Sequence, residues 1–414
     1  MDNTSKLKKN IGRLIILTIA GSTIYGLPYF RSYFYDAYLE AYNLTNTQMA
    51  MFGSMFGIFG AISYLFGGVV ADYISSRKLL SISLVVSGLA GLLHLMNPSY
   101  TMLLVIYMIW GFTSLFAFWP ALLKALRGMA NANEQSKAYG LMEGGRGIVN
   151  AVHLAIALAI FTYFSNKVGN LAGLNGIIVF YSVIVIALGI LLFFFMKDEK
   201  RDEIEKSKFT IKQVVLVLKY PAVWILSLIL CCTYTMNIAF YYFTPYATSS
   251  LGVTAAGAAV ITMMSQYIRP FASAGGGIIA DKIGRSKTFS IGFIIMAICT
   301  FIIAFMSGMS TGLFVALCAL IYFGMYFNYG LTFSMMDEGG IPTEISGTAI
   351  GVVCTLGYLP EIFAPLIAGR FLDAYGERGY KYYFIIVGAI MIIGIIALII
   401  WNKHIKNLKK TETN

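Results

Sequence analysis

Charged side chains are scarce in this 414-residue chain. Asp, Glu, Lys and Arg together make up 12% of the residues, whereas 58% are hydrophobic. Soluble domains carry about 25% charged residues. The shortage of charge therefore excludes an ordinary soluble globular protein and predicts a polytopic membrane protein, and the mean hydropathy of +0.76 agrees with this.

Cysteine is also rare, and no group of residues has the spacing of a metal site. The chain has five cysteines, all within apolar runs: Cys231, Cys232, Cys299, Cys318 and Cys354. Neither a disulfide framework, nor a zinc site, nor a cofactor is therefore expected. The net charge of +11 would suit a nucleic-acid partner, but the basic residues stand in short clusters between apolar runs. Such clusters are typical of topology signals, so we expect no nucleic acid to bind.

Twelve apolar runs are long enough to cross a bilayer, which takes roughly 20 residues. They cover residues 14–30, 47–71, 79–95, 100–123, 138–163, 174–196, 222–246, 255–280, 288–306, 311–336, 345–371 and 382–401. A run of mixed charge separates the first six from the last six. We expect an all-α protein with an N-terminal six-helix bundle at residues 1–196, a cytoplasmic linker at 197–220, a second six-helix bundle at 221–402 and a cytoplasmic tail at 403–414.

The basic residues predict the orientation. With twelve spans, 23 of the 30 Lys and Arg residues lie on the side of the two termini. Four lie on the opposite side (Lys167, Arg370, Arg378 and Lys381), and three lie within spans. Because basic loops stay in the cytoplasm, we expect both termini to be cytoplasmic and the protein to lie in the cytoplasmic (inner) membrane.

One loop is written twice, as GGVVADYISSRK at residues 67–78 and as GGIIADKIGRSK at residues 276–287. Two copies about half a chain apart indicate a duplicated bundle. The pattern resembles the signature loop of the major facilitator superfamily, although Ser75 stands where that pattern has glycine. The resemblance implies twelve transmembrane helices in two pseudo-symmetric bundles. It also implies that the repeated loops act as conformational switches, through Gly68, Asp72, Arg77, Gly277, Asp281 and Arg285.

Three arginines lie inside the spans, where an ionisable group costs several kcal/mol unless it faces a cavity or a partner. They are Arg31, Arg146 and Arg269. Guanidinium groups match the oxygens of carboxylate, phosphate or sulfonate, so the three arginines predict an anion site. Two of them could instead have a purely structural role. Arg146 could pair with Glu143 on the same helix face. Arg269, before Pro270, could bind freed carbonyls or pair with Glu361.

Other polar residues of the spans are candidates for the site. Tyr29 and Tyr267 each lie near an arginine, and Asn237 and Gln266 could add amide hydrogen bonds. Further aromatic residues at similar depths are Tyr25, Tyr33, Trp119, Tyr241, Tyr242, Tyr326 and Tyr358. Asp36, Glu143 and Glu361 could each carry a coupling proton or act as a static counter-ion. His153, seven residues after Arg146, is more often a packed residue than a proton relay.

A narrower resemblance rests on Tyr29–Phe30–Arg31, on Asp72 41 residues after Arg31, and on Trp119–Pro120. These residues are similar to the organophosphate:phosphate antiporter family, in which they imply a phosphate-binding arginine at Arg31. The second binding arginine of that family falls on Asn237, whereas a binding histidine of glycerol-3-phosphate transporters falls on Arg146. The segment EGGRG at residues 143–147 resembles a less-characterised branch that includes sulfosugar permeases.

These features predict a secondary transporter that moves a small organic anion by alternating access, with a proton or phosphate as coupling ion, and that acts as a monomer. The anion would be a sugar phosphate, a sugar sulfonate or a carboxylate. One alternative is a drug or lipid exporter of the same fold. Another is a membrane-embedded enzyme, although the sequence has no nucleophile–base arrangement that would favour one.

Overall fold

The computed structural model of the chain describes residues 6–131, 134–196, 211–332, 335, 339–342 and 345–412. Within these ranges the side chains of 65, 67–73, 135–137, 211, 274, 281, 330, 346–347 and 411–412 are not described. The side chains of Gly68, Asp72 and Asp281, and most of the expected linker, therefore lie outside the described residues.

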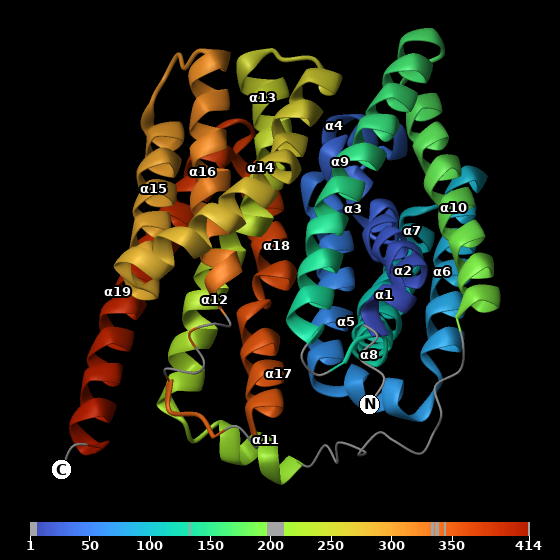
Figure 1. The fold of residues 1–414 in the computed structure, drawn as a ribbon. Helices are drawn as coiled ribbons and strands as arrows, with labels where there is room; N and C mark the ends of the chain where they lie inside the picture. The colour runs from blue at the N-terminus through green and yellow to red at the C-terminus, as the bar shows by residue number, and fades with distance from the viewer. Residues whose placement is uncertain are drawn as a thin grey trace. The chain divides into compact units, whose positions relative to one another are not determined.

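The chain forms two compact units, each of which is described by itself. The first comprises Met1–Leu44 with Ile58–Lys208, and the second comprises Thr45–Gly57 with Phe209–Asn414. The helices of the first unit, in chain order, are α1 (Lys6–Lys9), α2 (Ile11–Thr23), α3 (Gly26–Tyr33), α4 (Tyr35–Tyr42), the larger part of α5 (Asn46–Tyr73), α6 (Ser76–Leu92), the 3₁₀ turn η1 (Leu93–Met96), α7 (Tyr100–Gly111), the π-helix η2 (Phe112–Phe118), α8 (Trp119–Gly128), α9 (Gln135–Lys167) and α10 (Asn170–Phe195) (Figure 1).

The second unit is built in the same way. Its helices are α11 (Ile211–Val217), α12 (Pro221–Ala239), the 3₁₀ turn η4 (Phe240–Tyr242), α13 (Phe243–Leu251), α14 (Ala255–Ile283), α15 (Arg285–Phe305), α16 (Thr311–Leu331), α17 (Ser346–Gly357), α18 (Pro360–Tyr375) and α19 (Arg378–Glu412). Every regular element in the described part of the chain is helical. The sequence explains this, because in a bilayer a helix satisfies its backbone hydrogen bonds internally.

Nine helices among the described residues are long and apolar enough to cross a membrane. A tenth is added if α2 and α3, which are bent by 43° at a short break, form one span. The helices α5 and α14, of 28 and 29 residues, lie at two further expected positions. Helices therefore occupy each of the twelve apolar runs, and the first run is broken where the sequence predicted a continuous span.

The packing of each unit repeats that of the other. In the first unit α6 lies along α10 and α2 lies along α9. In the second unit α15 lies along α19 and α12 lies along α17 (Figure 1). In each half, the third span therefore packs along the sixth span, and the first span packs along the fifth. The duplication that the repeated loop indicates is therefore present in the helix packing as well.

The two copies of the repeated loop turn differently. Gly284 separates α14 from α15 with φ +93°, a backbone conformation that favours glycine. The equivalent Ser75 has an ordinary extended conformation, and its side chain accepts a hydrogen bond from the N–H of Lys78 at 3.3 Å. Ser75 is the N-cap of α6. The first copy of the loop therefore has a serine-capped helix start where the second copy has a glycine turn.

Candidate functional site

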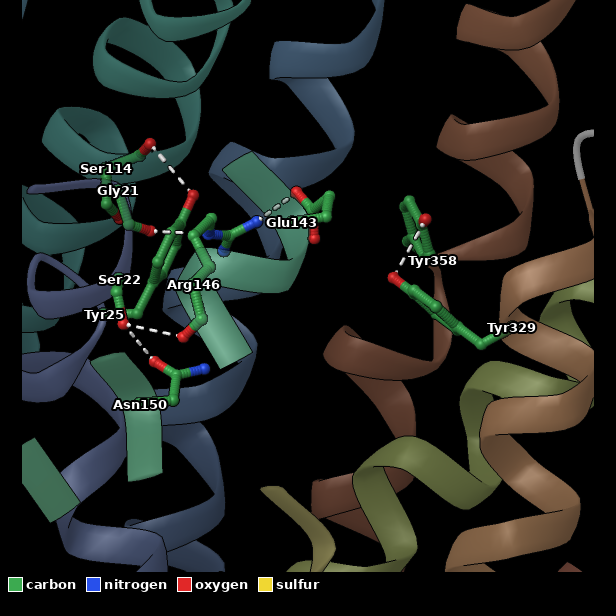
Figure 2. A network of polar contacts seen from close by, with 9 residues as sticks. All are labelled: Gly21, Ser22, Tyr25, Ser114, Glu143, Arg146, Asn150, Tyr329 and Tyr358. Carbon is green, nitrogen blue, oxygen red and sulfur yellow. Dashed lines mark hydrogen bonds and ion pairs between the residues drawn. The ribbon is translucent and has the colours of Figure 1, made fainter. Parts of the chain in front are cut away.

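A break in the first span places Tyr25 in the interior of the first unit. Pro28 lacks an N–H, and its ring conflicts with the carbonyl group four residues earlier, that of Ile24. The helix ends at Thr23 and starts again at Gly26 at that point. The half-buried Tyr25 lies in the break, and its hydroxyl donates to the carbonyl oxygen of Ser114 at 3.5 Å (Figure 2).

The π-helix η2 directs Trp119 towards the same region. The N–H of Trp119 bonds to the carbonyl of Ser114, five residues back, and Pro120 then has no N–H to give. Single π-turns inside α-helices occur frequently at functional sites. Sequence reasoning did not find this turn, because a π-turn has no hydrophobic period of its own.

Arg146, on α9, lies against both of these aromatic residues, whose ring centres are 6.4 Å apart. The centre of its guanidinium group is 4.8 Å from the ring of Trp119 and 5.8 Å from the ring of Tyr25. Its Nε donates to the carbonyl oxygen of Gly21 at 3.0 Å, and its Nη1 donates to Glu143 Oε1 at 2.7 Å (Figure 2). The aromatic faces stabilise the cation, and the two hydrogen bonds fix its plane.

The segment EGGRG explains how α9 comes this close to α2. A Cβ at Gly145 would lie 2.7 Å from Cγ2 of Thr18 on α2, so only glycine fits without a shift. A Cβ at the preceding Gly144 would meet nothing within 4 Å. The close approach at Gly145 allows Arg146 to reach the backbone of Gly21.

The pair that Glu143 and Arg146 form is unevenly buried. The Arg146 side chain is 12% exposed, whereas that of Glu143 is 42% exposed. The sequence offered this pair as an alternative to a ligand-binding role, and the structure contains it. Glu143 therefore offsets at least part of the charge of Arg146.

Behind Arg146 lies a network of polar side chains that joins three helices. Ser22, on α2, bonds to Asn150 Oδ1 and lies 3.4 Å from the main-chain oxygen of Arg146 (Figure 2). His153 Nε2 lies 3.0 Å from Asn150 Oδ1 and 3.2 Å from Ser22 Oγ. His153 Nδ1 lies 2.8 Å from the hydroxyl of Tyr181 on α10. Arg146, Asn150 and His153 follow the i, i+4, i+7 spacing of one helix face, which is the signal that could have found Asn150.

Arg31 lies against a different aromatic surface. It is 8% exposed, and its guanidinium carbon lies 5.2 Å from the centre of the Tyr107 ring. Tyr107 packs on Trp110 at 4.9 Å, and His94 stacks on Trp110 at 5.1 Å. The prediction that Arg31 contributes to an anion site stays a prediction.

In the second unit, Glu361 lies at a broken helix. It stands in the first turn of α18, which begins at Pro360 after a break from α17, and it is 6% exposed. The hydroxyl of Tyr234 on α12 donates to its Oε2. The start of a helix favours a carboxylate. Tyr358 adds its ring 4.5 Å from that of Tyr234 and accepts a hydrogen bond from the hydroxyl of Tyr329 at 3.1 Å (Figure 2).

Arg269, on α14, lies near Tyr326 of α16. The guanidinium carbon is 5.6 Å from the ring centre, and the amide of Gln266 donates to the Tyr326 hydroxyl at 3.3 Å. Tyr267, next to Gln266, is 43% exposed and lies on another face of the helix. The structure therefore places Gln266 and Arg269 at one tyrosine and directs Tyr267 away from it.

The remaining predicted residues are spread over both units. Tyr29 has its ring 6.5 Å from that of Tyr25, and Asp36 is half-buried in the first turn of α4. Asn237 is half-buried on α12, one turn after Tyr234. At the ends of the repeated loops, Arg77 lies 4.9 Å from the ring of Phe193, and both Gly277 and Arg285 are half-buried.

Comparisons with known proteins agree with this architecture. Residues 14–365 match the profile of the Major Facilitator Superfamily. Over 414 residues the chain is 28% identical to the inner membrane protein YihN of Escherichia coli (strain K12), covering 97% of this chain and 98% of that protein. Over 372 residues it is 28% identical to the inner membrane protein YqcE of the same organism, covering 87% of each.

A solved structure has the same fold. It is a bacterial homologue of the human lysosomal transporter Spinster in an inward-facing and unoccupied conformation, with a TM-score of 0.77, 13% identity, and coverage of 95% of this chain and 97% of that one. The predicted fold class is confirmed by the family match and by this likeness of fold. The chain is thus a multi-pass membrane transporter that belongs to the major facilitator superfamily.

Proposed function

We propose that the chain moves a small organic anion across the cytoplasmic membrane by alternating access, and that Arg146 binds the anionic group. One observation carries the proposal: the guanidinium group of Arg146 lies against the adjoining rings of Trp119 and Tyr25, with its Nε on a main-chain carbonyl. A cation fixed in this way inside a span has a geometry suited to a fork of anion oxygens.

The hydrogen-bonding capacity of Arg146 supports this role. A guanidinium group has five N–H donors. Among the described residues, its bonds to Gly21 and Glu143 use one N–H of Nε and one of Nη1. The donors that are left can bind carboxylate, phosphate or sulfonate oxygens.

Aromatic side chains favour an anion with an organic body. The rings of Trp119 and Tyr25 lie beside the guanidinium group, and ring faces together with phenolic hydroxyls suit the C–H and O–H surfaces of a sugar. The resemblance to the organophosphate:phosphate antiporters and to their sulfosugar branch points to the same class, a sugar phosphate or sugar sulfonate. Arg31 and Arg269, with Tyr29, Asn237, Gln266 and Tyr267, remain candidates for further contacts.

The proposal also includes a coupling ion, a membrane location and a conformational cycle. The coupling ion is a proton or phosphate, with Asp36, Glu143 and Glu361 as the candidate carboxylates. Glu361 is buried and accepts from Tyr234, which would hold its charge or its proton in place. The carrier acts as a monomer in the inner membrane with both termini in the cytoplasm, and contacts in the repeated loops at Asp72 and Asp281 break and re-form in each cycle.

The test uses purified protein in proteoliposomes and three probes that share a six-carbon body but differ in the anionic group. They are glucose 6-phosphate, gluconate and a hexose 6-sulfonate, each radiolabelled, and glucose is the neutral control. We expect saturable uptake of at least one anion and none of glucose. Uptake of none of the anions, combined with transport of a cationic dye or a lipid, would contradict the proposal in favour of an exporter.

A further inference from the structure

His153 is a buried titratable group that is connected to Arg146 through Ser22. It is 6% exposed, and its partners come from three helices: Asn150 on its own helix α9, Ser22 on α2 and Tyr181 on α10. Ser22 in turn lies against the main-chain oxygen of Arg146. A buried imidazole with hydrogen-bond partners on both ring nitrogens can gain or lose a proton as well as pack.

The partners define which nitrogen carries the proton in the neutral ring. The amide oxygen of Asn150 can only accept, so Nε2, at 3.0 Å, carries the hydrogen and donates. Nδ1 then accepts from the Tyr181 hydroxyl at 2.8 Å. A phenol can donate or accept, so a second proton taken from water can add to Nδ1 while the Tyr181 hydroxyl rotates to become the acceptor. Both protonation states of His153 are therefore fully hydrogen-bonded.

An anion bound at Arg146 favours the second proton on His153. Arg146 and His153 are seven positions apart on α9, about 10 Å along the helix. Two charges at about 10 Å in an effective dielectric constant of about 20 change each other's equilibria by on the order of tenfold. Glu143 already offsets much of the Arg146 charge, so a bound anion adds a negative charge at this distance, and the anion and the proton each favour the binding of the other.

Among the described residues, the titratable or charged groups near His153 are few. They are Arg146 and Glu143 on α9 and Tyr181 on α10, and Tyr33 of α3 is near Tyr181 in turn. The contact from α2 is the neutral Ser22. Arg146 is the cation among these groups, and an anion that binds to it would change the electrostatic potential at His153.

We propose that His153 is the proton site that is coupled to anion binding at Arg146, so that anion and proton travel together. This rests on the proposed function of Arg146 and moves the coupled proton from the carboxylates to an imidazole. The Ser22–Asn150 bridge connects the imidazole to the main-chain oxygen of Arg146.

The test compares dissociation constants at pH 4.5 and pH 8 for whichever of glucose 6-phosphate, gluconate or the hexose 6-sulfonate binds the wild-type protein. Each constant is corrected for the titration of that anion in water. Wild type should bind severalfold more tightly at pH 4.5, and His153→Gln should reduce the ratio to less than twofold. His94→Gln is the matched control, because His94 is also buried and also bonds to a tyrosine hydroxyl, that of Tyr38 at 3.0 Å. It should keep the wild-type ratio.

A second measurement separates coupling from a structural effect. In proteoliposomes, a pH gradient should drive accumulation of the same anion in wild type and in His94→Gln, whereas His153→Gln should exchange labelled for unlabelled anion without accumulating it. Loss of both accumulation and exchange in His153→Gln would overturn the proposal. So would a ratio that Glu361→Gln flattens and His153→Gln does not. If no probe binds wild type, the proposed function fails first, and the coupling falls with it.

Discussion

The Nε of Arg146 donates to the main-chain oxygen of Gly21 at 3.0 Å. Arg146, in the fifth span, is thus held by the main chain of the first span. This hydrogen bond does not depend on a side chain of α2. Because a backbone carbonyl is uncharged, the contact orients the guanidinium group and leaves its charge available.

The first prediction concerns the contact between α9 and α2. Gly145→Ala should lower the stability of the purified protein by about 1–3 kcal/mol, the usual cost of forcing extra atoms into a packed contact. A new Cβ there would lie 2.7 Å from Thr18. Thermal unfolding in detergent measures the change.

Gly144→Ala is the matched control on the next residue. The added Cβ meets nothing within 4 Å, so stability should stay the same or rise by about 0.5–1 kcal/mol, the difference in helix preference between glycine and alanine. Equal destabilisation by the two substitutions would show that the α2–α9 contact is not specific to Gly145.

A second prediction concerns the ring that faces Arg146. Trp119→Leu should weaken binding of the transported anion by about 0.5–2 kcal/mol, because the guanidinium group loses a cation–π partner. Equilibrium binding of the probe anion measures it. Trp224→Leu is the control, since Trp224 is 52% exposed on α12. If both variants lose affinity equally, the Trp119 ring does not orient Arg146.

A third prediction concerns orientation. Single cysteines introduced at residues 197–208 should react with a membrane-impermeant maleimide only from the cytoplasm, and cysteines near Lys167 only from outside. The excess of Lys and Arg on the side of the termini is the physical reason. The native cysteines are buried or half-buried and provide a low background. The reverse labelling pattern would invert the topology.

The sequence could predict the spans, the duplication and the family, because these depend on hydropathy and on a repeated loop. It also offered the Glu143–Arg146 pair, because an i, i+3 spacing puts the two side chains on one face. The break at Tyr25 and the π-turn before Trp119 were not predicted. Proline signals a break, but the direction of the chain beyond it depends on tertiary packing, and so does the identity of the ring that each arginine meets.

A fourth prediction concerns the repeated loops. Asp72→Asn and Asp281→Asn should slow transport severalfold while changing equilibrium anion binding less than twofold. The proposed contacts of these carboxylates belong to a conformational step rather than to the site. Rates of uptake and dissociation constants measured on the same preparation provide the comparison. Equal losses in both quantities would place the aspartates in substrate binding instead.

The central claim is that Arg146 binds the anion rather than only neutralising Glu143. Arg146→Gln and Arg146→Lys should each cost about 1.5–3 kcal/mol of binding, the range for hydrogen bonds to charged groups. The lysine variant keeps the charge and loses the planar fork, so it distinguishes geometry from charge.

The most direct measurement is calorimetry of anion binding to the Glu143→Gln, Arg146→Gln double variant. Both charges of the pair are then absent, so a purely structural salt bridge would leave folding and affinity together close to those of wild type. The account predicts a folded protein that binds the anion at least tenfold more weakly. Binding by the double variant within threefold of wild type would contradict it and remove Arg146 from the site.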